Sequence, residues 1–273
     1  SAGLFGYLSY EMINFVKKIS EIKKNDLNSP QSILFRPSII IIIDNVKGEI
    51  IAINPIWANN NSLKISSKDL YRKSIKTIKK VIKKISTPLK AYNFNFNKED
   101  RNIFKAKSNF TKKEFLNCVN KAIEYIRLGD ILQVVLSQRW KLKYNNKSFS
   151  FYRALRKTNP SPYMFYFNFG DFQVVGASPE ILVKVSKNKV TIRPIAGTRP
   201  RGKTLKEDRY YEKDLLKDKK ELSEHLMLLD LGRNDAGKVS KINSVKVTES
   251  FIIERYSHVM HIVSNVVGKY NKK

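Results

Sequence analysis

The stretch YMFYFNFGDFQVVGA, residues 163–177, decides the fold class. It holds two runs rich in aromatic and β-branched residues, 163–169 and 172–177, and both runs are typical of strands. Gly170-Asp171 joins them at the point where a tight turn is expected. The stretch therefore predicts a hairpin, and a hairpin pairs its strands in antiparallel order.

Strand-like and helix-like segments lie on both sides of this hairpin. Apolar runs bounded by turn residues predict further strands at 33–43, 49–53, 130–142, 181–185, 190–195, 244–255 and 258–267. Helical periodicity predicts helices at 67–86, 111–128, 148–157 and 205–232. Because hairpins are interspersed with helices and do not alternate strictly with them, the sequence predicts an α+β fold with largely antiparallel sheets.

Several helix ends carry specific signals. Ser67 is a candidate N-cap of the first helix. Thr111 and Glu114 form a capping box at the start of the second helix, and Gly129 is expected to end it. Asn159-Pro160 is expected to stop the third helix, because proline disfavours helical backbone at the residue before it.

The chain has 273 residues and a formal net charge of +28, which is typical of a nucleic-acid-binding protein. However, 39 of the 52 basic residues are lysines, and they are spread along the chain. Lysine is less suited than arginine to bidentate phosphate recognition, and AT-rich codons would produce the same bias. We expect no specific nucleic-acid partner. A basic nucleic-acid-binding module remains the alternative from another functional class.

The single cysteine, Cys118, cannot form an internal disulfide, and its amphipathic surroundings predict a buried structural thiol. The longest apolar run, Ile39–Ile43, is too short to span a bilayer. The N-terminus also lacks the basic-then-apolar order of a signal peptide. We expect a cytoplasmic protein with no membrane partner.

Glu221 and Glu224 lie one turn apart in the helix predicted at 205–232, so their carboxylates share a face. Converging carboxylates repel each other unless a cation neutralises them. Mg²⁺ binds oxygen ligands and keeps waters or substrate oxygens in its remaining positions. Glutamate pairs at this spacing are also common on solvated helices, so a magnesium site and an ordinary exposed face both remain open.

Further segments favour an enzyme. They are GDILQVVLSQR (129–139), the run from Asn159 to Glu180, RPIAGTRPRG (193–202), the acidic helix segment 221–235 and YSHVMH (256–261). In this order they resemble the chorismate-utilising enzymes and, within that family, the anthranilate synthase large subunits. The resemblance is continuous from about residue 108 to residue 268 and is weaker over 1–107.

The resemblance implies two large, mostly antiparallel β-sheets packed as a sandwich with flanking helices, with the active site between them. It implies that 1–107 is the end of an N-terminal region with a connecting segment. Residues 108–273 would be the N-terminal part of the chorismate-binding catalytic domain. One feedback motif and the later metal-binding glutamates of the family are expected to be missing, so these 273 residues alone are expected to be inactive.

The resemblance also implies a Mg²⁺ cofactor that holds the ring carboxylate of chorismate. Glu224 would bind the metal directly, and Glu221 would support it through water. Glu180 would lie near the departing ring hydroxyl and protonate it, which is the work of a general acid. Without the resemblance, Glu180 is an ordinary surface carboxylate at the end of a strand.

Three more residues are implied to contact the substrate or the reacting ring. Thr198 would offer its hydroxyl to the substrate, Gly197 would let the backbone approach closely, and His261 would lie near the reacting ring. Taken alone, Gly197-Thr198 is typical of an ordinary turn, and His261 of a core histidine on a strand.

Two further substrate-binding positions discriminate within the family. Isochorismate synthases carry a water-activating lysine where this chain has Gln133, and glutamine is not a base. Aminodeoxychorismate synthases often carry a nucleophilic lysine where this chain has Ala196. Both positions favour anthranilate synthase, and aminodeoxychorismate synthase is the alternative within the enzyme class.

The implied reaction converts chorismate and ammonia to anthranilate and pyruvate, the first committed step of tryptophan biosynthesis. Ammonia would come from a glutamine amidotransferase subunit, with which the enzyme would form a heterotetramer. Tryptophan would act as a feedback inhibitor. Its expected binding residues are Asn159, Pro160, Ser161, Tyr163, Met164 and Phe165.

Overall fold

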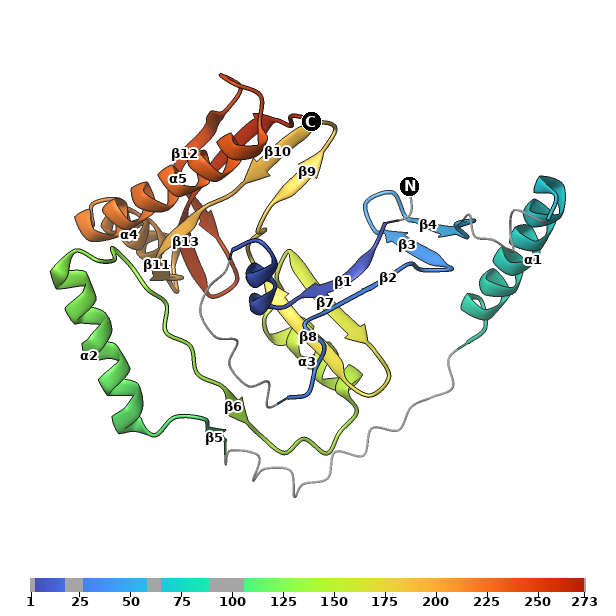
Figure 1. Cartoon of the computed structure of the whole chain (residues 1–273), viewed down its shortest axis with the longest axis horizontal. Helices are drawn as coiled ribbons and strands as arrows, with labels where there is room; N and C mark the ends of the chain where they lie inside the picture. Colours follow the sequence, from blue (N-terminus) through green and yellow to red (C-terminus); the bar gives the residue numbers. More distant parts are fainter. Residues whose placement is uncertain (1–2, 18–26, 58–64, 89–105, 273) are drawn as a thin grey trace. The chain divides into compact units, whose positions relative to one another are not determined.

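The computed structural model in Figure 1 describes residues 3–17, 27–57, 65–88 and 106–272. Contacts divide the chain into two compact units, Ser1–Phe104 and Lys105–Lys273. Within the described ranges, no helix is both long and apolar enough to cross a lipid bilayer.

The first unit contains short antiparallel strand pairs and one long helix. In chain order its elements are β1 (Phe5–Leu8), η1 (Tyr10–Phe15), β2 (Ser32–Phe35), β3 (Ile40–Asp44), β4 (Glu49–Ile53) and α1 (Ser67–Ile85). Strand β1 pairs with β2, and β3 pairs with β4. The single strand predicted at 33–43 is wrong, because Pro37 cannot donate a ladder hydrogen bond and lies between β2 and β3.

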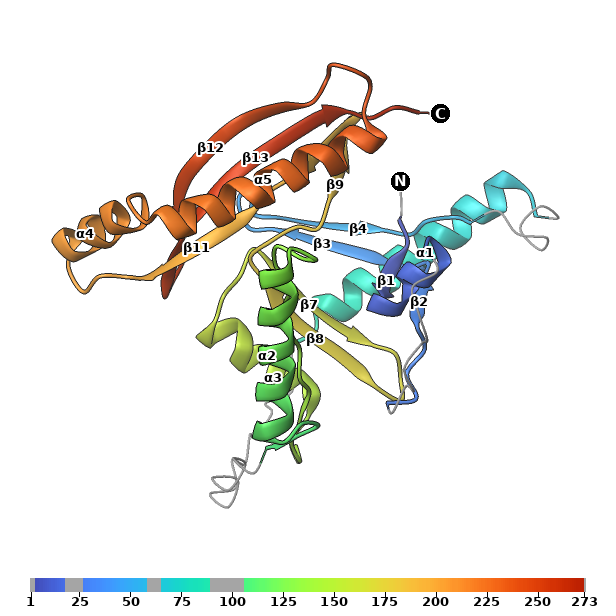
Figure 2. The same cartoon turned by 60° about the vertical axis from the view of Figure 1, so that its left-hand side comes forward.

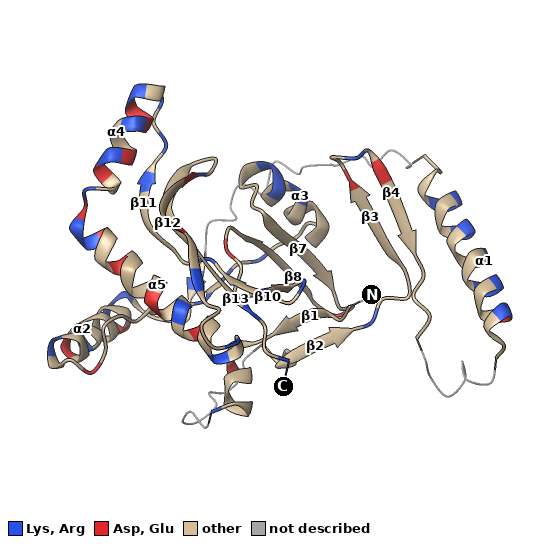
Figure 3. Cartoon of the chain, turned by 90° about the horizontal axis from the view of Figure 1, so that it is seen from above, with Lys and Arg blue, Asp and Glu red and all other residues tan. Residues whose placement is uncertain are grey.

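Helix α1 confirms the basic helix predicted at 67–86. Figure 3 shows Lys and Arg residues along its length. The N-cap is Ser66 and not the predicted Ser67, because the Ser66 hydroxyl accepts a hydrogen bond from the backbone N–H of Asp69 at 3.2 Å.

The described part of the second unit is α+β with antiparallel strand pairs. Its helices are α2 (Lys112–Leu128), α3 (Ser148–Thr158), α4 (Leu205–Leu215) and α5 (Lys219–Val239). Its strands are β5 (Lys107–Ser108), β6 (Trp140–Lys141), β7 (Tyr163–Asn168), β8 (Gln173–Ser178), β9 (Lys184–Ser186), β10 (Lys189–Ile192), β11 (Ile195–Pro200), β12 (Lys246–Arg255) and β13 (Val259–Lys269). Strands β7 and β8 form the hairpin predicted at 163–177. The predicted fold class is confirmed.

The local signals around α2 are also confirmed. The Thr111 hydroxyl accepts from the backbone N–H of Glu114 at 3.2 Å, and the Glu114 carboxylate accepts from the backbone N–H of Thr111 at 2.7 Å. Gly129 ends the helix in the left-handed conformation, at φ 80°. Cys118, on α2, is half-buried and not fully buried as predicted.

Strand β13 is the centre of a five-stranded sheet. Strand β12 pairs along one edge of β13, while β10 and β11 pair in succession along its other edge. Strand β9 pairs with the free edge of β10. Figure 2 shows α5 lying along this sheet, in agreement with its contacts to β10, β11 and β13.

The helix predicted at 205–232 is in fact two helices, α4 and α5. Asp218 caps α5 by accepting hydrogen bonds from two backbone N–H groups of its first turn, at 3.0 and 3.3 Å. Arg199, on β11, pairs with Asp214 at 2.6 Å and with Asp218 at 2.8 Å. These contacts hold the break between the helices against the sheet.

The strand predicted at 130–142 is wrong over most of its length. Only β6 takes part in a ladder, with β5. Leu132 and Val135 are 82% and 85% exposed. β-branched residues favour a strand, but a strand also needs a neighbouring backbone, and no described segment pairs with 130–139 as a ladder.

The core lies between the sheet and the helices α4 and α5. Its buried clusters are formed by Leu215, Met260 and Ile262 and by Leu229, Ala236 and Val266. Met260, Ile262 and Val266 share one face of β13, because side chains alternate along a strand. His261 lies between two of them in sequence, so its side chain is on the opposite face of the sheet.

We expect Leu215→Ala to lower the free energy of unfolding by about 2–5 kcal/mol, because it removes a fully buried side chain between α4 and β13. Urea denaturation followed by circular dichroism measures this loss. Leu216→Ala is the matched control: Leu216 is 38% exposed, so a loss of about 1 kcal/mol or less is expected. Equal losses for the two variants would contradict this description of the core.

Candidate active site

The site begins with a β-bulge in β11. Two residues, Arg193 and Pro194, separate β10 from β11, which begins at Ile195. In the ladder with β13, Ala196 pairs with Ile262 and Thr198 pairs with His261, so Gly197 is an extra residue. Gly197 has φ 68°, a conformation that glycine adopts readily. A Cβ atom there would also lie 3.1 Å from the Ile262 and Leu215 side chains, so the bulge requires glycine.

The bulge directs two oxygen atoms at one imidazole nitrogen. Nδ1 of His261 lies 2.9 Å from the backbone carbonyl oxygen of Gly197 and 3.1 Å from Oγ1 of Thr198. A carbonyl oxygen can only accept, so Nδ1 carries the hydrogen. In the neutral ring, Nε2 is then the nitrogen without a hydrogen, and it can accept a hydrogen bond. The Thr198 hydroxyl accepts from Nδ1–H, which leaves its own hydrogen available to a ligand.

Glu180 lies beside this histidine. It follows β8, where its backbone N–H donates to the Ser178 hydroxyl at 3.3 Å. Burial raises the pKa of the Glu180 carboxyl, against the opposing effects of a hydrogen bond from the backbone N–H of Ile195 and of the His261 charge. A partly buried acid therefore lies near an imidazole, and this pair of side chains is suited to acid–base chemistry.

The glutamate pair on α5 forms a second cluster. Oε1 of Glu224 accepts a hydrogen bond from Nε2 of Gln133 at 2.9 Å, so the structure brings together two residues that are far apart in the sequence. Glu221 is half-buried one turn earlier on α5. Across residues 3–17, 27–57, 65–88 and 106–272, no three or more His, Cys, Asp or Glu side chains gather as metal ligands would.

The predicted site residues thus fall into separate groups. Glu180, Gly197, Thr198 and His261 are close neighbours, with Ala196 buried in the adjoining strand position. Gln133, Glu221 and Glu224 are associated with the N-terminal half of α5. In the part of the chain that the structure describes, no hydrogen bond or ion pair links the two groups directly.

The residues predicted to bind tryptophan form one continuous segment. Asn159 follows α3 as its C-cap, and Tyr163, Met164 and Phe165 are the first residues of β7. The Phe165 ring packs over Gly176 on β8, where a Cβ atom would lie 2.2 Å from the ring. Tyr163 pairs with Ser178, so the segment adjoins the strand end that carries Glu180.

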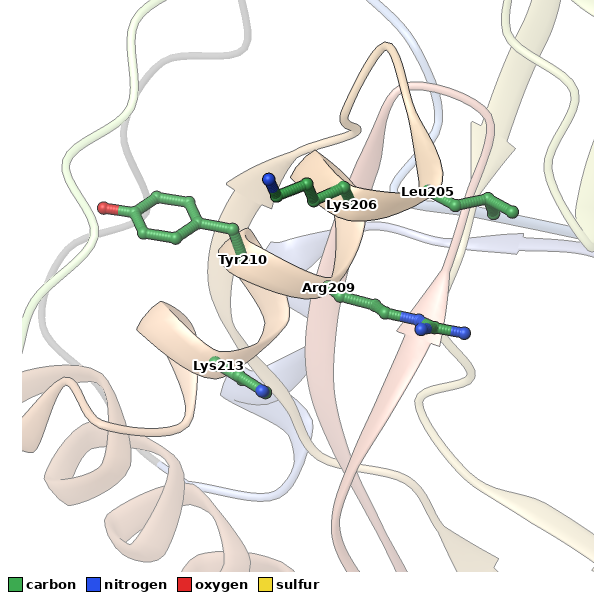
Figure 4. Close-up of a pocket in the computed structure, with 5 residues that line it drawn as sticks. All are labelled: Leu205, Lys206, Arg209, Tyr210 and Lys213. Carbon is green, nitrogen blue, oxygen red and sulfur yellow. The ribbon is translucent and has the colours of Figure 1, made fainter.

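A surface hollow of about 510 Å³ lies elsewhere (Figure 4). Its lining residues all belong to α4: Leu205, Lys206, Arg209, Tyr210 and Lys213. Leu205 is 79% exposed and Tyr210 is 66% exposed. An open hollow on the outer side of a single helix, without any predicted site residue, is not a candidate active site.

Sequence reasoning missed three side chains beside His261. They are Arg193, Glu254 and Tyr256, which are joined by hydrogen bonds to one another. Arg193 is the first residue of the segment 193–202, and Tyr256 is the first residue of the segment 256–261, both of which carry the family resemblance. Tyr256 lies two residues after Glu254, a spacing that puts both side chains on one face of a strand. No local pattern marks Arg193 as a partner of Glu254, because that contact depends on the strands that pair with β13 from both sides.

The structure thus brings a hydroxyl and a histidine together at one bulge of an antiparallel α+β fold, with an acid nearby, and such a group of side chains is suited to acid–base chemistry. The chain matches the model of the chorismate binding enzymes over residues 1–273, and it belongs to that family.

Its relatives are more specific. The chain is 52% identical over 270 residues to anthranilate synthase component 1 of Cereibacter sphaeroides. The aligned residues make up 98% of this chain and 53% of the relative. It is 42% identical over 267 residues to the protein of the same name from Aquifex aeolicus, and the aligned residues make up 98% of this chain and 53% of that relative.

A solved structure agrees with these relatives. The crystal structure of anthranilate synthase component I from Streptococcus pneumoniae has a TM-score of 0.86 at 33% identity, over 100% of this chain and 58% of that one. The chain therefore spans about half the length of the curated relatives that it matches.

The geometry at the bulge predicts that neutral His261 is the Nδ1–H tautomer. Long-range ¹H–¹⁵N NMR of protein labelled at histidine measures this, with the signals assigned by single substitutions. His258 is the control, because among the described residues its Nδ1 contacts the Ser257 hydroxyl, which can donate or accept, so mixed tautomers are expected there. A dominant Nε2–H form at His261 would contradict the described site.

Proposed function

We propose that this chain is part of an anthranilate synthase large subunit, which converts chorismate and ammonia to anthranilate and pyruvate in the first committed step of tryptophan biosynthesis. The single observation that carries the proposal is the grouping of Glu180, Thr198 and His261 at the Gly197 bulge. The names of the relatives support it. Gln133 and Ala196 support it further, because neither supplies the lysine expected for the related reactions.

The expected chemistry has two steps. Ammonia adds at ring carbon 2 while the hydroxyl at carbon 4 leaves, and pyruvate is then eliminated as the ring becomes aromatic. Glu180, which holds its proton to higher pH, would protonate the departing hydroxyl. Thr198 would donate its free hydroxyl hydrogen to the substrate, and Nε2 of His261 would accept a hydrogen bond or a proton.

Mg²⁺ is the cofactor that we propose. Glu224 and Glu221 offer the oxygen ligands that Mg²⁺ binds, and Gln133 already orients one carboxylate oxygen of Glu224. Bound there, the ion would neutralise the ring carboxylate of chorismate. The proposal requires that the α5 cluster and the His261 cluster contact the same substrate molecule.

The proposed partners follow from the same function. We infer a cytoplasmic enzyme that receives ammonia from a glutamine amidotransferase subunit, in a heterotetramer, and that is inhibited by tryptophan. The segment from Asn159 to Phe165 would bind the inhibitor. Its position beside the end of β8 supports this, because a ligand there would be close to Glu180.

We expect Glu180→Gln to lower kcat about 10²- to 10⁴-fold, because an amide cannot protonate the leaving hydroxyl. Anthranilate fluorescence, with chorismate, ammonia and Mg²⁺ supplied to the intact protein, measures the rate. Glu124→Gln, an exposed glutamate on α2, is the matched control and should be fully active. An active Glu180→Gln variant would remove Glu180 from this role.

The pH profile gives an independent check on the same residue. The pKa of Glu180 is raised, so its protonated form persists above the ordinary carboxyl range and is lost as the pH increases further. The wild-type rate should therefore fall on the alkaline side as Glu180 loses its proton. The residual rate of Glu180→Gln should lack this decrease.

We expect Glu224→Gln and Glu221→Gln to weaken Mg²⁺ binding, with the larger effect at Glu224, because each removes one negative charge from the proposed ligand set. Calorimetric titration with Mg²⁺ measures the affinity without relying on turnover. Glu124→Gln again serves as the control. Unchanged Mg²⁺ affinity in both variants would place the metal elsewhere.

We expect these 273 residues, expressed alone, not to convert chorismate, because they span about half of the relatives' length. The same fluorescence assay measures this, with an intact relative as the positive control. Turnover by the isolated chain would show that the residues described above are sufficient for the reaction.

A further inference from the structure

Three side chains form a row across the sheet with His261 at its centre. On one side His261 pairs with Thr198 of β11, and on the other it pairs with Glu254 of β12. Residues directly opposite one another on neighbouring antiparallel strands have their side chains on the same face. The imidazole is therefore flanked by the hydroxyl that it contacts and by a carboxylate.

Tyr256 completes this row from the end of β12. Its ring packs against the His261 ring at a centroid distance of 5.5 Å and an interplanar angle of 61°, which is an edge-to-face arrangement. Its hydroxyl donates to Oε2 of Glu254 at 2.8 Å. The aromatic ring is thus held at its far end by a carboxylate.

The backbone of Tyr256 is also fixed. Its N–H donates to the carbonyl oxygen of Val259 at 2.8 Å, closing the turn between β12 and β13. Its carbonyl oxygen accepts from Nη1 of Arg201 at 2.6 Å. Because both ends of the residue are restrained, the ring has little freedom to move away from His261.

Arg193 neutralises the carboxylate that holds Tyr256. Its guanidinium pairs with Oε1 of Glu254 and lies 3.7 Å from Oε2 of Glu249. The Arg193 and Glu254 side chains are only 33% and 28% exposed, so solvent screens this pair less than a surface ion pair. Burial, together with Glu254, raises the pKa of Tyr256 to about 12, so its phenol remains a neutral donor.

We propose that Tyr256, held by Glu254 and Arg193, is a positioning residue that fixes the ring of His261 for the reaction. The inference rests on the proposed function. The Gly197 carbonyl and Thr198 restrain one ring nitrogen, while Tyr256 restrains the ring plane. With both restraints in place, Nε2 of His261 points in one direction.

The test uses the intact protein with Tyr256→Leu and Tyr256→Phe. Leucine removes the ring contact, so kcat should fall about tenfold, with the KM for chorismate changed less than about twofold. Phenylalanine keeps the ring and loses only the bond to Glu254, so it should restore kcat to within about threefold of wild type. Tyr210→Leu, at an exposed tyrosine on α4, is the matched control and should leave kcat unchanged.

A second readout does not depend on turnover. Histidine ¹⁵N NMR should show one sharp set of His261 signals in wild type and Tyr256→Phe, and broadened signals in Tyr256→Leu, where the plane of the ring is no longer restrained. Unchanged kcat and an unchanged His261 spectrum in Tyr256→Leu would overturn the proposal. If Tyr256→Leu does not fold, Tyr256→Met, which also lacks the ring, decides by the same two readouts: a lowered kcat at constant KM supports the role, and an unchanged kcat overturns it.

The two readouts keep the proposals separate. Absence of chorismate turnover by the intact wild-type protein would contradict the proposed function, while the His261 spectrum would still show whether Tyr256 fixes the ring. Normal wild-type turnover with no effect of either Tyr256 substitution would contradict the positioning role alone.

Discussion

Strand β13 is hydrogen-bonded along both edges, and this double pairing fixes the side chains of the candidate site. Because β11 and β12 pair with it from opposite sides, Thr198 and Glu254 flank His261 at fixed spacing. The alternation of β13 places Met260 and Ile262 against the helices and His261 on the other face. One strand therefore contributes core side chains on one face and a side chain of the candidate site, His261, on the other.

The elements that the sequence predicts well are those whose signals are local. The hairpin at 163–177 and the capping box at Thr111 each depend on residues within a few positions of one another. The prediction at 130–142 failed because β-branched residues show only that a segment suits a sheet, and not that a partner strand lies beside it. The break between α4 and α5 depends partly on Arg199, which lies on a distant strand.

The residues of the candidate site also divide into those that were predicted and those whose contacts were not. Glu180, Thr198 and His261 were predicted through the resemblance to a family, and the structure places them together. The contact between Gln133 and Glu224 brings two predicted residues together across the chain. The pair of Arg193 with Glu254 was not predicted, since an ion pair between segments far apart in the sequence leaves no periodic trace. The contact of Tyr256 with Glu254 is local, at a spacing of two residues, and was also missed.

The register of the β7–β8 hairpin links the start of β7 to the position of Glu180. Tyr163 opens β7 opposite Ser178, and Glu180 follows two residues later on the same chain. A molecule seated at the start of β7 that displaced this strand would displace the acid as well, through backbone hydrogen bonds alone. The start of β7 and the acid after β8 are thus coupled within one pair of strands.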